Sequence, residues 1–153
     1  MVMISKKRHL VWILVSAVSC YAGPEYTTRH GLRIWDHSYN REDIEGLTAE
    51  FLALAPYGYN PFYGQNIDVF FHNARLGCPE DPAGCYGITT PLTMIDIYAW
   101  TPCLRRTAFV HELAHMARGL VEHDVDYNHR DVVFWGPDGL VSNLGGDCES
   151  TGD

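Results

Sequence analysis

The sequence lacks an apolar run long enough to span a bilayer. Its longest apolar segment near the N-terminus, residues 10–18, is much shorter than the roughly 20 residues that a membrane helix needs. Positive charge is also scarce, because 11 Lys and Arg stand against 19 Asp and Glu, giving a formal net charge of -8. These absences disfavour a transmembrane helix and the basic surface typical of nucleic-acid binding.

Repeats, low-complexity blocks and linkers are absent between residue 25 and the glycine-rich C-terminal end. A chain of 153 residues without such boundaries leaves room for one domain with one hydrophobic core. We therefore expect a single domain over residues 25–153.

The first 20 residues have the pattern of an export signal. Basic residues at 6–8 precede the apolar run, and small residues and Cys20 follow it. The segment AVSC resembles the lipobox of bacterial lipoproteins, although Ala17 stands where a Leu is usual, and Cys20 would then be lipidated as the mature N-terminus. Cleavage after Ala22 is the alternative. We expect residues 1–20 to be a signal peptide and the protein to be exported, either lipid-anchored at a bacterial cell envelope or secreted.

Four cysteines remain once Cys20 is set aside, and they contain no C-x-x-C pair. The missing spacing disfavours a structural zinc site made of thiolates. An even number of thiols in an exported protein instead indicates two disulfides. Of the three possible connectivities we prefer Cys78 with Cys85, across the segment CPEDPAGC, and Cys103 with Cys148.

The alternation of apolar stretches with turn-forming residues predicts an α+β fold. We expect a helix over residues 41–55, and strands over 28–36, 67–73, 86–90 and 92–100. The near-continuous apolar character of the second of these strands suggests burial on both faces. We expect loops over 78–85 and 120–139.

A second helix is predicted to begin after Thr101, which can cap it, with Pro102 at the first helical position. We predict that it runs to Arg118 and that Gly119 ends it. It contains the motif HELAH at 111–115, whose two histidines lie one helical turn apart and can bind the same metal ion. The chain's own His and Glu frequencies give roughly 0.02 chance matches to this motif.

The three polar residues of this motif have separate roles in the chemistry that we expect. His111 and His115 would ligate zinc, which lowers the pKa of a bound water to about 7 and polarises the scissile carbonyl. Glu112 would be the general base on that water and would then protonate the leaving amine. The motif thus predicts zinc-dependent hydrolysis of peptide bonds.

HELAH on a helix that follows a small mixed sheet resembles the zincin group of zinc metallopeptidases. The architectural resemblance covers roughly residues 30–130, whereas in specific residues only His111, Glu112 and His115 match. It implies a small zincin-like domain in which a mixed β-sheet packs on two helices, the second carrying the motif. It also implies an edge strand, around residues 86–90, that pairs with an extended peptide or protein substrate.

The resemblance does not extend to a third zinc ligand. The metzincin pattern would place Gly and His where this chain has Arg118 and Val121, and no methionine follows Met116 to form that subgroup's Met-turn. The glutamate-ligand subgroup would need a Glu on a following helix. The candidate Glu149 lies in the segment GGDCESTGD, whose residues disfavour a helix. The zincin subgroup therefore stays unassigned.

Four residues just beyond the motif are candidates for the third ligand. We favour His129, because Asp126 or Asp131 could accept its second N–H and because the apolar segment DVVFW could hold its loop against the motif helix. The alternatives are His123, which also has acidic neighbours, and one of the aspartates, Asp124 or Asp126.

Tyr127 and Tyr86 are candidates to stabilise the oxyanion of a tetrahedral intermediate, because a phenol can donate to developing negative charge. Packing is the simpler role for both rings.

Two other classes of protein stay open: a non-catalytic envelope binding protein that keeps the zincin-like fold, and a disulfide-stapled structural domain in which the motif is accidental. Glu112 argues against the first, because binding alone needs no general base. The second predicts no stoichiometric metal.

Overall fold

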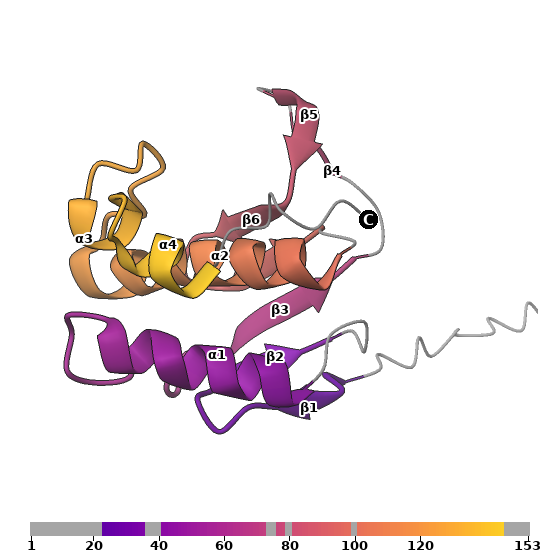
Figure 1. Ribbon diagram of the computed structural model, residues 1–153. Helices are drawn as coiled ribbons and strands as arrows, with labels where there is room; N and C mark the ends of the chain where they lie inside the picture. Colours follow the sequence, from indigo (N-terminus) through magenta and orange to yellow (C-terminus); the bar gives the residue numbers. More distant parts are fainter. Residues whose placement is uncertain (1–22, 36–40, 73–75, 79–80, 99–100, 146–153) are drawn as a thin grey trace, which may run out of the picture.

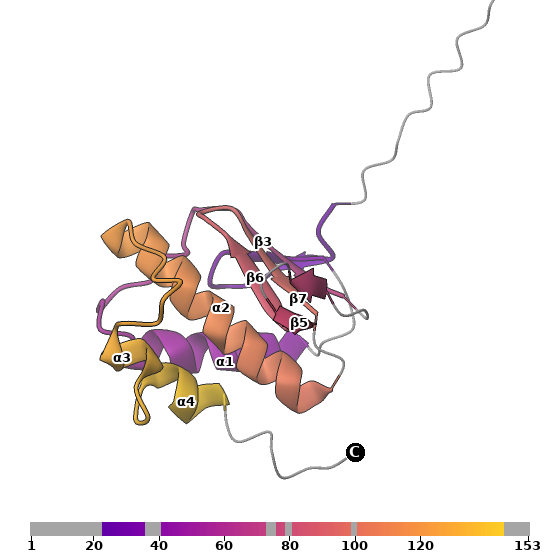
Figure 2. The same ribbon diagram turned by 90° about the horizontal axis from the view of Figure 1, so that it is seen from above.

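The computed structural model describes residues 23–35, 41–72, 76–78, 81–98 and 101–145, with the backbone alone at 41–42, 76–78 and 81–85. Helices cover one face of a five-stranded sheet, and two further strands form a separate hairpin (Figure 1, Figure 2). The described elements are β1 (Tyr26–Thr27), β2 (Leu32–Ile34), α1 (Arg41–Leu54), β3 (Ile67–Phe71), β4 (Leu76–Cys78), β5 (Asp81–Cys85), β6 (Gly87–Thr90), β7 (Met94–Ile97), α2 (Pro102–Glu122), α3 (Val132–Trp135) and α4 (Leu140–Gly145).

The sheet is mixed, with the strand order β1-β2-β3-β7-β6. The inner pairs β2–β3 and β3–β7 are parallel, whereas the outer pairs β1–β2 and β6–β7 are antiparallel. β6 is therefore an edge strand that is antiparallel to its neighbour β7. The predicted combination of a mixed sheet with helices is confirmed.

The core lies between this sheet and the two long helices, α1 and α2, and the side chains of β3 alternate across it. Its inward residues are buried: Ile67, Val69 and Phe71. The prediction that this strand is buried on both faces is wrong, because helices cover only one face of the sheet (Figure 2). On the other face Phe70 stacks between Trp35 and His72, which explains its apolar character.

Both long helices begin where the sequence predicts. The Thr101 side chain caps α2 by accepting the Leu104 N–H at 3.2 Å, with Pro102 in the first turn. Cys103, in the same turn, is disulfide-bonded. Its predicted partner Cys148 lies outside the described residues, so the pairing stays a prediction. No helix in the described part of the chain is both long and apolar enough to cross a membrane.

The helix α2 is longer than predicted, because it continues through Gly119 to Glu122. Arg118 and Glu122 form an ion pair at 3.0 Å across the last turn, an i,i+4 contact that supports helix beyond the glycine. His123 ends the helix with φ 57, the left-handed conformation that we expected Gly119 to supply four residues earlier.

Two predicted loops contain regular structure. The predicted loop 78–85 contains the end of β4 and all of β5, which pair antiparallel, since a composition rich in Gly and Pro is also that of short hairpins. The side chains of Cys78 and Cys85 are outside the described part, so their disulfide stays a prediction. Within 120–139, α3 forms because the Asp131 side chain caps it, accepting the Val133 N–H.

Candidate metal site

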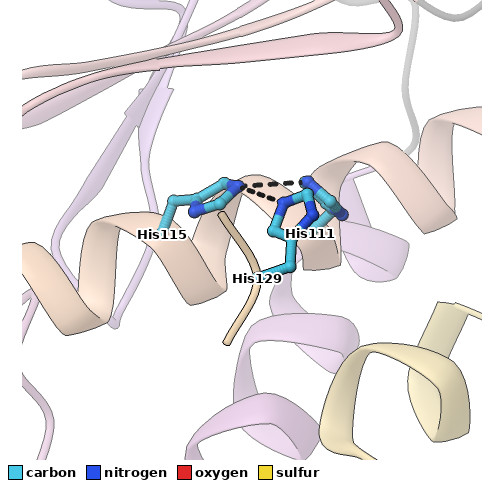
Figure 3. Close-up of side chains that lie close together, drawn as sticks. All are labelled: His111, His115 and His129. Carbon is cyan, nitrogen blue, oxygen red and sulfur yellow. Dashed lines mark hydrogen bonds between the residues drawn. The ribbon is translucent and has the colours of Figure 1, made fainter. Parts of the chain in front are cut away.

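Three histidines converge beside α2 (Figure 3). His111 and His115 project from one face of α2, and His129 comes from the loop that follows the helix. The Nε2 atom of His115 lies 3.1 Å from Nε2 of His111 and 3.2 Å from Nε2 of His129. The structure thus brings the motif pair together with the favoured third residue, whereas the alternative, His123, lies outside this cluster at the helix end.

The spacing of these nitrogens fits a metal ion. Two imidazole nitrogens bound to zinc at about 2.0–2.1 Å and at a tetrahedral angle would be roughly 3.3 Å apart. The Nδ1–H of His115 donates to the main-chain oxygen of Val125 at 2.7 Å, an arrangement that leaves its Nε2 as the ligand atom. The three histidines lie close enough to bind one metal ion, as the sequence predicts.

The protonation states also suit metal binding. Burial, together with smaller effects of the neighbouring His115 and His129, lowers the pKa of His111 to about 3. Burial likewise lowers the pKa of His115, although the hydrogen bond to Val125 opposes this shift. His111 and His115 are therefore neutral at pH 7, with a lone pair available on each ring.

A buried carboxylate organises the loop of residues 123–131, which joins α2 to α3 and contains His129; we call it the ligand loop. Asp126, which is 3% exposed, accepts the main-chain N–H groups of Arg130 at 3.1 Å and Asp131 at 2.9 Å, and the indole N–H of Trp135 at 2.9 Å. Burial alone would raise the pKa of Asp126, but these hydrogen bonds and the nearby Arg118 outweigh it and lower the pKa to about 2. The carboxylate therefore stays ionised and holds the loop in one shape.

The same loop is tied to α2 by a buried cation. The guanidinium of Arg118 hydrogen-bonds to Asp131 and lies 3.8 Å from Asp124 and 3.9 Å from Asp126. Arg118 is only 6% exposed, so these carboxylates are the partners that compensate its burial. The Arg that stands in place of the metzincin Gly thus fixes the loop that carries the third histidine.

Trp135 packs directly on the three imidazoles, with ring centroids at 4.8, 4.5 and 4.5 Å from those of His111, His115 and His129. The adjacent Phe134 is fully buried, so the predicted apolar anchor of the loop is confirmed for this residue, whereas Val132 and Val133 are exposed. Trp135 itself is only partly buried. Its contact with the ligands could not be read from local sequence, because it depends on how α3 folds back over α2.

Glu112 lies beside the histidines and is held by the edge strand. The Thr89 hydroxyl is 2.7 Å from Glu112 Oε2 and 3.1 Å from the Glu112 main-chain oxygen. Burial raises the pKa of Glu112 to about 7; the hydrogen bond from Thr89 opposes the shift and the charge of Asp96 adds to it. Sequence reasoning missed Thr89, because no local pattern marks a strand residue that contacts a helix 23 positions later.

These residues share one cleft of about 240 Å³, which is lined by Gly87, Ile88, Thr89, His111, Glu112, His115, Tyr127 and His129. Tyr127 is 59% exposed, and its hydroxyl donates to the main-chain oxygen of Thr89 at 3.2 Å. Tyr86, the other candidate for oxyanion stabilisation, is not among the lining residues. The cleft therefore combines the metal-binding cluster, a buried carboxylate and an exposed phenol.

A larger hollow of about 480 Å³ lies between α1 and the start of α2. Glu50 and Arg106 face each other there at 3.8 Å, and both side chains are largely exposed. An exposed ion pair of this kind is ordinary surface chemistry. The smaller cleft is the better candidate site despite its size, because the histidines and Glu112 line it.

The low pKa of Asp126 makes stability sensitive to acid. Its folded-state pKa of about 2 lies below the ordinary value of 3.8, so ionised Asp126 stabilises the fold above about pH 4. This contribution should be lost as the pH falls from 4 towards 2. Urea unfolding of the metal-free protein across that range measures it. An Asp126→Asn variant should show a flatter dependence, and an equally steep one would contradict this assignment.

No family model matches the sequence, and no match is found among curated proteins or solved structures.

Proposed function

We propose that the protein is a zinc-dependent metallopeptidase with a zincin-like fold. The observation that carries this proposal is the convergence of three imidazole Nε2 atoms in the cleft that also contains buried Glu112. Zinc is the proposed metal, because three His nitrogens with room for a further ligand are a typical catalytic zinc set.

The order of elements supports the zincin-like assignment. The helix α1 is followed by the sheet strand β3 and the separate β4–β5 hairpin, then by the antiparallel pair of the edge strand β6 and β7, and finally by the motif helix α2. The resemblance to zincins implies the same general order, namely a helix, strands, an edge strand that lines the substrate, and then the motif helix. The edge strand also contacts α2 at Glu112 through Thr89, so the substrate edge and the motif border the same cleft.

The residues of the cleft have distinct roles in the proposed hydrolysis. Bound zinc would supply Lewis-acid polarisation of the substrate carbonyl and activation of the attacking water. Glu112 takes a proton from that water and later delivers it to the leaving amine. The Tyr127 hydroxyl can donate to the developing oxyanion once it leaves the main-chain oxygen of Thr89.

The edge strand β6 offers a binding surface for an extended peptide. The main-chain N–H of Tyr98 donates to the oxygen of Tyr86, and antiparallel pairing alternates bonded and non-bonded positions along a strand. The main-chain groups of Gly87 and Thr89 therefore point away from β7, towards the open edge. We propose a peptide or protein substrate that adds to this edge as a further strand, displacing Tyr127 from Thr89.

We further propose that the protein acts outside the cytoplasm, anchored to a bacterial envelope membrane through lipidated Cys20 or secreted. This part rests on the export-signal pattern of residues 1–20, which lie outside the described residues. A lipid anchor would be the contact with a membrane, and the acidic charge of the chain disfavours a nucleic-acid partner.

Zinc content tests the metal site. The folded chain, supplied with zinc and dialysed, should retain about one ion per molecule, and His115→Ala and His129→Ala should each abolish this retention. His123→Ala is the matched control, because this histidine lies outside the cluster, and it should bind zinc like the wild type. Retention of zinc by His129→Ala would exclude His129 as the third ligand.

Cleavage of fluorescently labelled unfolded casein tests the reaction. The zinc-loaded protein should release fluorescent peptides, a chelator should stop the release, and added zinc should restore it. Stoichiometric zinc without cleavage of casein or of a library of unstructured peptides would favour the non-catalytic binding protein. A folded chain that retains no zinc would make the motif accidental.

A further inference from the structure

Gly87 in the edge strand lies against the carboxylate of Glu112. A Cβ atom added at this glycine would lie 2.6 Å from Glu112 Cγ, 2.7 Å from Oε1 and 2.9 Å from Cδ. All three distances are too short for real carbon contacts, so Glu112 or the strand would have to move. Gly87 is not among the described residues with positive φ, so backbone strain does not require glycine there. The lack of a side chain is what the site uses.

Thr89 contacts the same carboxylate from two positions further along β6. Side chains two residues apart on a strand point to the same face, so position 87 and Thr89 both face α2. Thr89 holds Oε2 at 2.7 Å, while the empty position at Gly87 accommodates Cγ and Oε1. The strand thus holds the carboxylate on one side by a hydrogen bond, and on the other it leaves space for the carboxylate where Gly87 has no side chain.

We propose that Gly87 and Thr89 form a cradle that sets the orientation of the Glu112 carboxylate, and that both are positioning residues for the general base. The catalytic meaning of this cradle rests on the proposed peptidase function. The contact itself does not, because it is made by the chain's own residues without the metal. A side chain at position 87 would force Glu112 or the strand to move and would so disturb the hydrogen bond from Thr89.

A double-mutant cycle on the metal-free protein tests the contact without any activity. Gly87→Ala should lower the melting temperature by about 2–4 °C in the wild-type background, because the new methyl group displaces the buried carboxylate. In a Glu112→Ala background the same change should have little effect. Gly46→Ala is the matched control, since an added Cβ there meets no atom within 4 Å and alanine favours a helix. Equal effects of Gly87→Ala in both backgrounds, including no effect in either, would overturn the cradle.

Kinetics on a peptide that the wild type cleaves test the positioning role. Gly87→Ala should lower kcat by about 10- to 100-fold, with KM within about twofold and zinc content unchanged, since misplacing a catalytic group by about 1 Å has effects of this size. Thr89→Val should act in the same direction, and Thr89→Ser, which keeps the hydroxyl, should restore most of kcat.

The two experiments separate failure of the cradle from failure of the proposed function. Full kcat in both Gly87→Ala and Thr89→Val, where wild-type cleavage depends on Glu112, would overturn the positioning role and leave the peptidase intact. If the wild type cleaves nothing, the peptidase proposal fails, and the stability cycle still decides whether the cradle exists. Should Gly87→Ala fail to fold while Gly87→Ala/Glu112→Ala folds, the clash with Glu112 is supported directly.

Discussion

Replacing Glu112 by Gln is expected to lower kcat for peptide cleavage by about 10²- to 10⁴-fold, because the amide cannot take a proton from the attacking water. Gln is close to Glu in size, so Thr89 can still hold its side-chain oxygen and the packing of α2 should persist. The three histidines do not depend on this carboxylate, and the variant should bind zinc at the wild-type stoichiometry. Steady-state kinetics together with metal analysis of the same sample measure both effects.

The control for this prediction is Glu122→Gln at the end of the same helix. Glu122 is bound by Arg118 and Tyr57, and it does not line the cleft. Its substitution should leave kcat within about threefold of the wild type, as expected for a group outside the reacting site. Wild-type kcat in Glu112→Gln would remove Glu112 from the mechanism. Loss of zinc in that variant would instead show that the carboxylate supports the metal site.

Replacing Asp126 by Ala is expected to lower the free energy of unfolding by about 3–5 kcal/mol, because it removes one side of a buried ion pair. Two main-chain N–H groups and the Trp135 indole would lose their acceptor, and buried Arg118 would lose a carboxylate. The ligand loop would no longer be held in one shape, so zinc affinity should fall by about 10- to 100-fold. Urea unfolding of the metal-free protein and competition with a zinc chelator measure these changes.

Asp138→Ala provides the comparison for Asp126, since Asp138 is an exposed aspartate in the turn before α4. It should change the free energy of unfolding by less than about 0.5 kcal/mol and leave zinc affinity unaltered. If Asp126→Ala kept both wild-type stability and wild-type affinity, the loop would have to be held mainly by Arg118 and the apolar anchor.

Local signals in the sequence were sufficient for the features that depend on neighbouring residues. Thr101 and Pro102 mark the start of α2, and the HELAH spacing places two imidazoles on one helix face. The favoured third ligand also depended on local chemistry, because acidic residues and an apolar anchor surround His129. The structure places its ring with the motif pair.

Features set by packing between distant segments could not be predicted in this way. Gly119 was predicted to end the helix, yet α2 continues through it. Tertiary contacts and the Arg118–Glu122 ion pair outweigh the cost of about 1 kcal/mol that glycine has relative to alanine inside a helix. The apolar residues of β3 did not reveal that one face of the sheet is uncovered. The contacts of Gly87 and Thr89 with the motif helix depend on how β6 docks, which no single stretch of sequence encodes.

The loop between α2 and α3 has an unusual backbone, with left-handed φ values of 57, 51 and 53 at His123, Asp126 and His129. None of these residues is glycine, so the loop keeps its shape through the contacts it makes rather than through intrinsic preference. An ion bound by His115 and His129 would act as a reversible cross-link between residues 14 positions apart. The local stability of this segment would then follow the concentration of free metal, while that of the sheet would depend on the hydrophobic core. Metal supply would thus control how readily this one segment opens to solvent and to proteases, without unfolding the rest of the protein.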